Sequence, residues 1–142
     1  MTILIVTARF YEDIADALLQ GATDALDKTG TAYEVLEVPG ALEIPPAIRL
    51  GIANGKYDGY IALGCVIRGE TSHYDTVCNE SARGLMDMAL THCAPIGNGI
   101  LTVENRDQAM ARASIDQMNK GGGATIACLS LLQTKQKLGA NA

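Results

Sequence analysis

Four short apolar runs alternate with segments of helical periodicity along this chain of 142 residues. The runs cover residues 3–7, 33–38, 60–67 and 100–103, and the first is almost uniformly apolar, as in a strand buried on both faces. Strands that alternate with helices form parallel sheets with right-handed crossovers and with helices on both faces. The pattern therefore predicts one α/β domain over residues 1–142, with a four-stranded parallel sheet flanked by helices.

Apolar spacing and capping residues predict where the intervening helices lie. Asn105 is followed three positions later by Gln108, which is typical of a capped helix start. Three glycines at residues 121–123 are expected to precede the last helix. Helices are expected at residues 14–26, at 44–54, from the third run toward residue 90, at 107–119 and within 125–138.

Composition restricts the classes of partner. With 48% hydrophobic residues the chain can bury a core, and with no Trp and one Phe that core must be mainly aliphatic. The formal net charge of −5 argues against a nucleic acid or an anionic membrane as partner, because both need a basic face. No apolar run approaches the ~20 residues that span a bilayer, and no signal peptide is recognisable, so a cytoplasmic protein is expected.

The spacing of the cysteines argues against a metal site and against disulfides. Cys65, Cys78, Cys93 and Cys128 lie far apart without a C-x-x-C pair, each in an apolar or helical segment. This distribution predicts reduced, buried thiols, and neither a metal site nor a disulfide framework.

The predicted sheet indicates where a ligand site should lie. In open parallel sheets, ligands bind beyond the carboxyl ends of the strands. The segments at those ends are Arg9-Phe10, residues 39–43, residues 68–73 and the region around Asn98 and Glu104.

The turn at residues 68–73 has the character of an anion site. Gly69 permits a sharp turn, and Thr71 is a good helix-initiating residue, so unpaired N–H groups at a helix start would face an anion such as phosphate. His73 can take and give a proton near neutrality, oriented by Asp75 or Glu70, or it merely caps the helix. Glu70 would repel an anion, so its backbone N–H is the expected contribution, with its side chain turned away or paired with an arginine.

Other candidate residues have simpler alternatives. Arg112 has a guanidinium that suits phosphate, but it is equally a solvated helix charge. Lys120 is a C-terminal dipole partner or a Schiff-base lysine. Phe10 is either a site residue or a packing contact on the first helix, and Glu43 is either a ligand or a first-turn acid.

Three segments resemble the lumazine synthase family: V-P-G-A-L-E-I-P at residues 38–45, L-G-C-V-I-R-G-E-T-S-H at 63–73 and L-T-V-E-N at 101–105, followed by Gln108-Ala109 and Arg112. The resemblance runs from Arg9-Phe10 nearly to the C-terminus. It implies a flavodoxin-like three-layer sandwich and a transferase of riboflavin biosynthesis. This enzyme condenses 5-amino-6-(D-ribitylamino)uracil with 3,4-dihydroxy-2-butanone 4-phosphate to 6,7-dimethyl-8-ribityllumazine, phosphate and water. It implies no cofactor and no metal, with a Schiff base between the substrates and not on Lys120.

The resemblance also implies a role for each matching position. Phe10 would stack on the pyrimidine, and His73 would be the catalytic proton-transfer group. The backbone at Glu70 and Thr71 would bind phosphate together with Arg112. Lys120 would approach the uracil, and Asn98 would reach in from a neighbouring subunit. The ribityl chain and uracil edge would be held by Ala41, Leu42, Glu43, Cys65, Val66 and Ile67.

Some positions depart from the family pattern. Asn98 stands where many members have phenylalanine, so one wall of the site should be more polar. Leu42 stands where an aromatic or hydroxyl residue is common. Residues 113–117 lack the glycine- and lysine-containing kink associated with icosahedral shells, and the chain begins almost at its first strand. We therefore expect a homopentamer, alone or stacked as a decamer, with riboflavin synthase as a candidate partner.

Two other functions stay open at this point. One is a non-catalytic flavin- or lumazine-binding paralogue that keeps the pocket but not turnover. The other is the related archaeal type of riboflavin synthase, which the His73 turn favours less because that reaction uses no phosphate.

Overall fold

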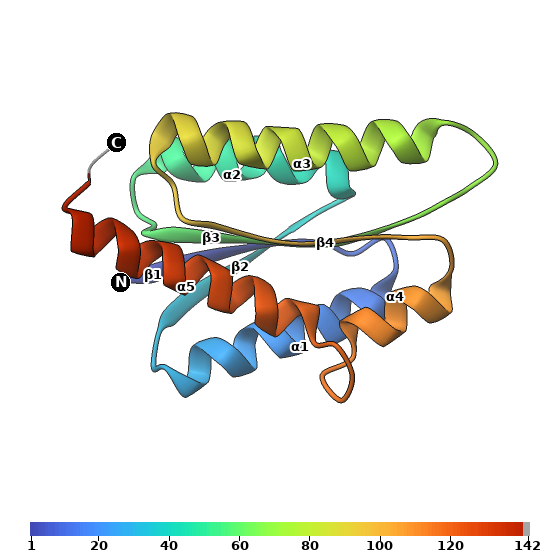
Figure 1. The fold of residues 1–142 in the computed structure, drawn as a ribbon, viewed down its shortest axis with the longest axis horizontal. Helices are drawn as coiled ribbons and strands as arrows, with labels where there is room; N and C mark the ends of the chain where they lie inside the picture. The colour runs from blue at the N-terminus through green and yellow to red at the C-terminus, as the bar shows by residue number, and fades with distance from the viewer. Residues whose placement is uncertain (141–142) are drawn as a thin grey trace.

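The computed structural model describes residues 1–140, which form four strands and five α-helices (Figure 1). In chain order these are β1 (Thr2–Ala8), α1 (Glu12–Lys28), β2 (Ala32–Val38), the short 3₁₀ helix η1 (Ala41–Glu43), α2 (Ile44–Asn54), β3 (Gly59–Ile67), α3 (His73–His92), β4 (Ile96–Val103), α4 (Arg106–Ala113) and α5 (Lys120–Leu138). Within this part of the chain, no helix is long and apolar enough to cross a membrane.

The strands form one parallel sheet in the order β2-β1-β3-β4. Helices α2 and α3 cover one face, and α1, α4 and α5 cover the other (Figure 1). Along β1, Ile3 and Ile5 join the core beneath α1 and α5, while Leu4 and Val6 join the core beneath α2 and α3. Both faces are covered, which explains the uninterrupted apolar run and confirms the predicted three-layer, flavodoxin-like fold.

Strand β4 is longer than predicted, because it begins at Ile96 and not at residue 100. The first half of β4 is difficult to recognise from the sequence, since Gly97 and Gly99 are typical of turns. A Cβ built on Gly97 would lie 1.9 Å from the carbonyl oxygen of Ala124 in α5. Glycine is therefore required here because helix and strand backbones approach closely, and not because the chain turns.

The last two helices also differ from the prediction. Helix α4 ends at Ala113 instead of continuing to residue 119, and α5 begins at Lys120 and includes all three glycines. Asn119 adopts a left-handed conformation (φ 47°) and its side chain accepts a hydrogen bond from the Gly122 N–H at 3.2 Å, which caps α5. Lys120 therefore lies at the start of a helix, and the alternative that it compensates a C-terminal dipole is wrong.

The predicted cap of α4 is confirmed. The Asn105 side chain accepts from the Gln108 N–H at 2.8 Å, and the Gln108 side chain accepts from the Glu104 N–H, also at 2.8 Å. The hydrogen bond to the Gln108 side chain thus comes from Glu104, the residue before the capping Asn105. This bond joins the end of β4 to α4.

The four cysteines are free thiols, but the prediction that all are buried is wrong for Cys93. Cys128 is buried, and Cys65 and Cys78 are partly buried, whereas Cys93 is exposed where α3 ends in a left-handed residue (φ 49°). A helix end that turns outward exposes its last residue even when the preceding segment is amphipathic.

Candidate active site

A hollow of about 420 Å³ lies beyond the carboxyl ends of β1 and β3, where parallel sheets place their ligands. We call it the His73 hollow. Most of the predicted site residues meet there, although they come from three separate segments of the chain, residues 10–11, 40–43 and 65–77. Its lining comprises Phe10, Tyr11, Gly40, Ala41, Leu42, Glu43, Cys65, Val66, Ile67, Gly69, Thr71, His73, Tyr74 and Val77.

The turn before α3 presents the beginning of a long helix to this hollow. His73 is the first residue of α3, and its backbone N–H donates to the Thr71 Oγ1 at 3.3 Å. The Ser72 side chain makes no capping hydrogen bond. Glu70 is exposed and is not among the lining residues, in keeping with a side chain that turns away. The start of α3 thus faces the hollow while the Glu70 carboxylate is not part of its lining, as an anion site would require.

Arg68 does not supply positive charge to the hollow. Its Nε lies 2.6 Å from a Glu104 carboxylate oxygen, and its guanidinium lies 4.2 Å from the centre of the Tyr74 ring. The hydrogen bond to Glu104 is the main reason that the pKa of Arg68 is raised. Asp75 also lies 3.7 Å from Arg68 and makes no hydrogen bond to His73. Arg68 therefore ties the end of β4 to the start of α3, and the prediction that Asp75 orients His73 is not supported.

The wall of the hollow near the end of β1 and within β3 combines one exposed ring with a protonated thiol. Phe10 is 75% exposed, so it does not pack against α1 as the simpler alternative required. Burial raises the pKa of the Cys65 thiol to about 11, which keeps it neutral at ordinary pH. Cys65 thus contributes shape and backbone groups to the wall of the hollow, and not a nucleophile.

A second hollow, of about 440 Å³, holds the remaining predicted side chains and shares no lining residue with the first. We call it the Arg112 hollow. It lies between β4 and the helices α4 and α5, with Asn98, Arg112 and Lys120 in its wall. The Asn98 side chain accepts from the Ile100 N–H at 2.9 Å, so it covers an outward-facing group of this edge strand. Within one chain, these three residues do not meet His73.

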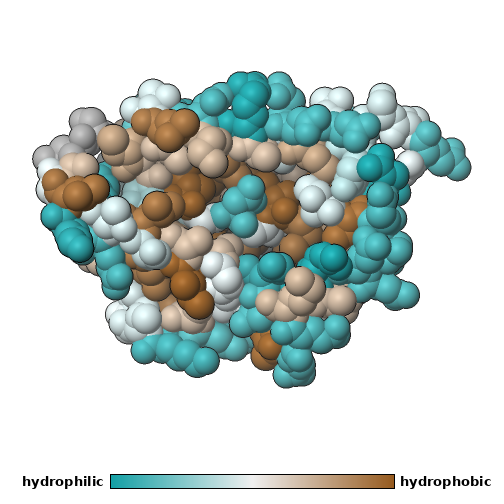
Figure 2. All heavy atoms as spheres, viewed as in Figure 1, coloured by the Kyte–Doolittle hydropathy of each residue, from teal (hydrophilic) through white to brown (hydrophobic). Residues whose placement is uncertain are grey.

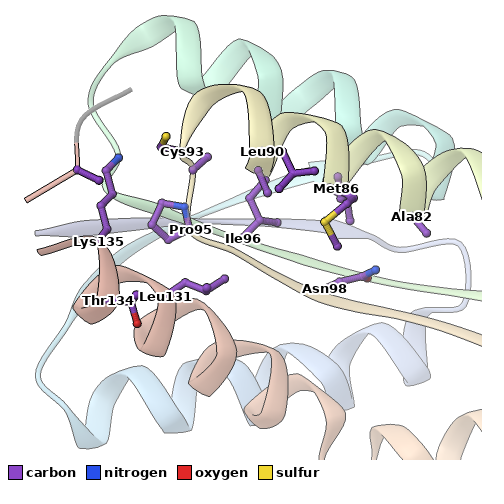
Figure 3. Close-up of a pocket in the computed structure, with 14 residues that line it drawn as sticks. Ala82, Met86, Leu90, Cys93, Pro95, Ile96, Asn98, Leu131, Thr134 and Lys135 are labelled. Carbon is purple, nitrogen blue, oxygen red and sulfur yellow. The ribbon is translucent and has the colours of Figure 1, made fainter. Parts of the chain in front are cut away.

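An apolar groove of about 410 Å³ runs between α3 and α5 over the start of β4 (Figure 3). We call it the α3–α5 groove. Met86 and Leu90 line it from α3, Leu131 lines it from α5, and Asn98 lies at one end (Figure 3). Figure 2 shows hydrophobic side chains gathered between the two helices on this face. Because Asn98 belongs to both linings, the groove adjoins the Arg112 hollow.

Sequence reasoning missed several lining residues of the His73 hollow, chiefly Tyr11, Tyr74 and Val77. Tyr11 and Tyr74 each follow a predicted site residue, and that adjacency was the available signal. Among residues 1–140, no group of three or more His, Cys, Asp or Glu side chains is placed to hold a metal ion.

Comparison with known proteins adds independent information. The family model described as 6,7-dimethyl-8-ribityllumazine synthase matches residues 1–136. The 6,7-dimethyl-8-ribityllumazine synthase 1 of Rhizobium meliloti (strain 1021) is 55% identical, over 97% of this chain and 94% of that protein. The 6,7-dimethyl-8-ribityllumazine synthase of Agrobacterium fabrum (strain C58) is 55% identical over 96% of both chains. A third, from Bartonella henselae (strain Houston 1), is 55% identical over 96% of this chain and 90% of its own length.

Proposed function

The chain belongs to the 6,7-dimethyl-8-ribityllumazine synthase family, and on that premise we propose that it carries out this synthesis at the His73 hollow. The substrates are 5-amino-6-(D-ribitylamino)uracil and 3,4-dihydroxy-2-butanone 4-phosphate. The observation that carries the proposal is the meeting of Phe10, Glu43, Thr71 and His73 in one hollow. The relatives that bear this name favour the synthase over the non-catalytic binding protein.

The residues of the hollow suit the steps of this condensation. The pyrimidine stacks on Phe10, and its ribityl hydroxyls donate to Glu43. The substrate's amine attacks the ketone carbon, and loss of water leaves a Schiff base between the two substrates. His73 then moves the protons that allow the phosphate to leave and the second nitrogen to close the ring with loss of water. The protein supplies orientation and proton transfer, and the reactive groups are the substrates' own.

The phosphate is bound by local donors, because the net charge of −5 repels an anion at long range. The backbone N–H groups at Glu70 and Thr71 lie at the start of α3, at the positive end of a 20-residue helix. Arg68 is engaged by Glu104, so the guanidinium that completes the phosphate site is that of Arg112.

Arg112, Lys120 and Asn98 reach this site from a neighbouring copy. Two observations support this arrangement: the three residues share a separate hollow, and that hollow adjoins the apolar α3–α5 groove, which a second copy would cover. A contact between two different faces of identical chains closes into a ring when the rotation allows. We therefore propose a homopentamer, alone or paired as a decamer. Native mass spectrometry tests the ring, and a sixty-subunit particle would exclude it.

The direct test of the function mixes the purified protein with both substrates. Lumazine absorbance should rise, with inorganic phosphate released in step. Lumazine binding without turnover would instead identify a carrier, and conversion of added lumazine to riboflavin would identify a riboflavin synthase.

The remaining proposals concern the setting of the enzyme. We place all of these roles on one domain over residues 1–142, in the cytoplasm. Riboflavin synthase, which consumes the product, is the candidate partner of the ring. Co-elution of the two purified enzymes in size-exclusion chromatography would support their association.

A further inference from the structure

We infer that Tyr11 is a positioning residue, which holds the Phe10 ring in the orientation that receives the pyrimidine. The inference depends on the proposed stacking role of Phe10. It extends that role, because the exposed Phe10 ring would take its orientation from Tyr11, a residue that has no part in the function proposed above.

The two rings make an edge-to-face pair. Their centroids are 5.0 Å apart and their planes are inclined at 83°, a geometry favoured by the ring quadrupoles. Both rings line the His73 hollow. Phe10 is 75% exposed, while Tyr11 is partly buried and packs against the core beneath α1. One ring is therefore anchored in the protein, and the other projects from it.

Tyr11 is itself held by a contact that is distant in sequence. The Arg106 guanidinium, at the start of α4, lies 5.8 Å from the centre of the Tyr11 ring. Arg106 is fixed in turn by an ion pair and hydrogen bond with Asp13 in the first turn of α1. A chain of side-chain contacts thus runs from the α1–α4 contact to the hollow, through Asp13, Arg106, Tyr11 and Phe10.

An exposed ring without such support loses rotational freedom when a ligand stacks on it. A ring already oriented by an edge-to-face partner has lost most of that freedom before binding. Aromatic pairs of this kind change equilibrium constants by roughly two- to tenfold. Tyr11 should therefore affect binding of the pyrimidine and of the lumazine product, and leave the phosphate side of the site alone.

A double-mutant cycle with the assembled protein tests this inference. Tyr11→Ala should weaken lumazine binding roughly two- to tenfold and raise the KM of the pyrimidine to a similar extent, with kcat and the KM of the butanone phosphate unchanged. Tyr11→Phe keeps the ring and should match the wild type. In a Phe10→Ala background, Tyr11→Ala should have no further effect, because the ring that it positions is gone. Additive effects, or failure of Tyr11→Phe to preserve binding, would overturn the inference.

A second measurement does not depend on activity. Phe10 is the only phenylalanine of the chain, so incorporation of fluorophenylalanine places a single ¹⁹F reporter on its ring. Tyr11→Ala should shift that resonance. Tyr33→Ala is the matched control, since Tyr33 packs against the same core but lies at the opposite end of the sheet, beside Ile3. If the wild type bound no lumazine, the proposed function would fail, and the resonance would still decide the ring contact. An unchanged resonance in Tyr11→Ala would refute that contact.

Discussion

Gly121 in the first turn of α5 packs directly against the backbone of Leu18 in α1. A Cβ built on Gly121 would fall 2.0 Å from the Leu18 carbonyl oxygen, which is far inside any real contact. The two helices can approach this closely only because the position has no side chain. A Cβ built on the neighbouring Gly123, by contrast, would have no atom from beyond its own helix turn within 4 Å.

These two glycines should respond oppositely to alanine. Gly121→Ala forces backbone atoms apart and is expected to lower the free energy of unfolding by about 2 kcal/mol or more. Gly123→Ala meets no obstacle within its own chain, so the subunit itself should be unaffected or stabilised by up to about 1 kcal/mol, since alanine loses less entropy in a helix. Gly123 lines the Arg112 hollow, where a neighbouring copy would lie. Urea unfolding at one fixed protein concentration measures both. A Gly121→Ala protein as stable as Gly123→Ala would contradict the close approach.

A second matched pair concerns buried hydroxyls. Thr7 and Thr125 are both fully buried, but the Thr125 hydroxyl donates to the Gly121 carbonyl at 3.1 Å, whereas the Thr7 Oγ1 is the one buried side-chain N or O atom of residues 1–140 without a partner. Thr7→Val should therefore be neutral or stabilising, and Thr125→Val should cost about 1 kcal/mol. Thermal unfolding of the two variants compares them, and equal losses of stability would argue that Thr7 has a hydrogen-bond partner.

The role of His73 predicts a loss of rate with little loss of binding. His73→Ala should lower kcat by roughly two to four powers of ten, because proton transfer is removed while the substrates stay oriented. Residual turnover is expected, since positioning contributes separately. Single-turnover kinetics with phosphate release, compared with lumazine affinity, separates the two effects. Unchanged turnover would remove His73 from the mechanism.

The division of the site between two copies predicts subunit complementation. Arg112→Ala should mainly raise the KM of the butanone phosphate, and His73→Ala should lower kcat. If the two variants are dissociated, mixed and reassembled, about a quarter of the sites in random rings combine an intact His73 with an intact Arg112. Activity at low butanone phosphate should then exceed that of either variant. No recovery after confirmed exchange of subunits would place Arg112 in the site of its own chain.

The raised thiol pKa of Cys65 predicts a specific pH dependence. Burial favours the neutral thiol and raises its pKa to about 11, and only the thiolate reacts with iodoacetamide. At pH 8 roughly one Cys65 side chain in a thousand should be ionised, with labelling about tenfold faster for each pH unit up to 10. Peptide mass spectrometry should find Cys65 labelled much more slowly in the folded protein than in urea. Equal rates at pH 8 would mean that the thiol is not desolvated.

Much of the fold could be predicted because its signals are local. Continuous apolar runs identified the strands, and the Asn105–Gln108 pair identified the start of α4, since periodicity and capping involve residues only a few positions apart. The misplaced starts of β4 and α5 both involve glycine. Gly97 and Gly121 each lie where two backbones approach closely. The sequence does not indicate which distant segment packs against a glycine.

The sequence by itself determined the order of strands and helices, and hence the edge of the sheet where Phe10, Glu43 and His73 meet. Only the tertiary structure decided which side chains share a hollow. In the folded chain Arg68 pairs with Glu104, and Arg112 lies in a different hollow from His73. Tyr11 contacts the Phe10 ring on one side and the Arg106 guanidinium on another. The physical reason is range: secondary structure follows from neighbours along the chain, whereas the charge and orientation of a site depend on contacts between residues that only folding brings together.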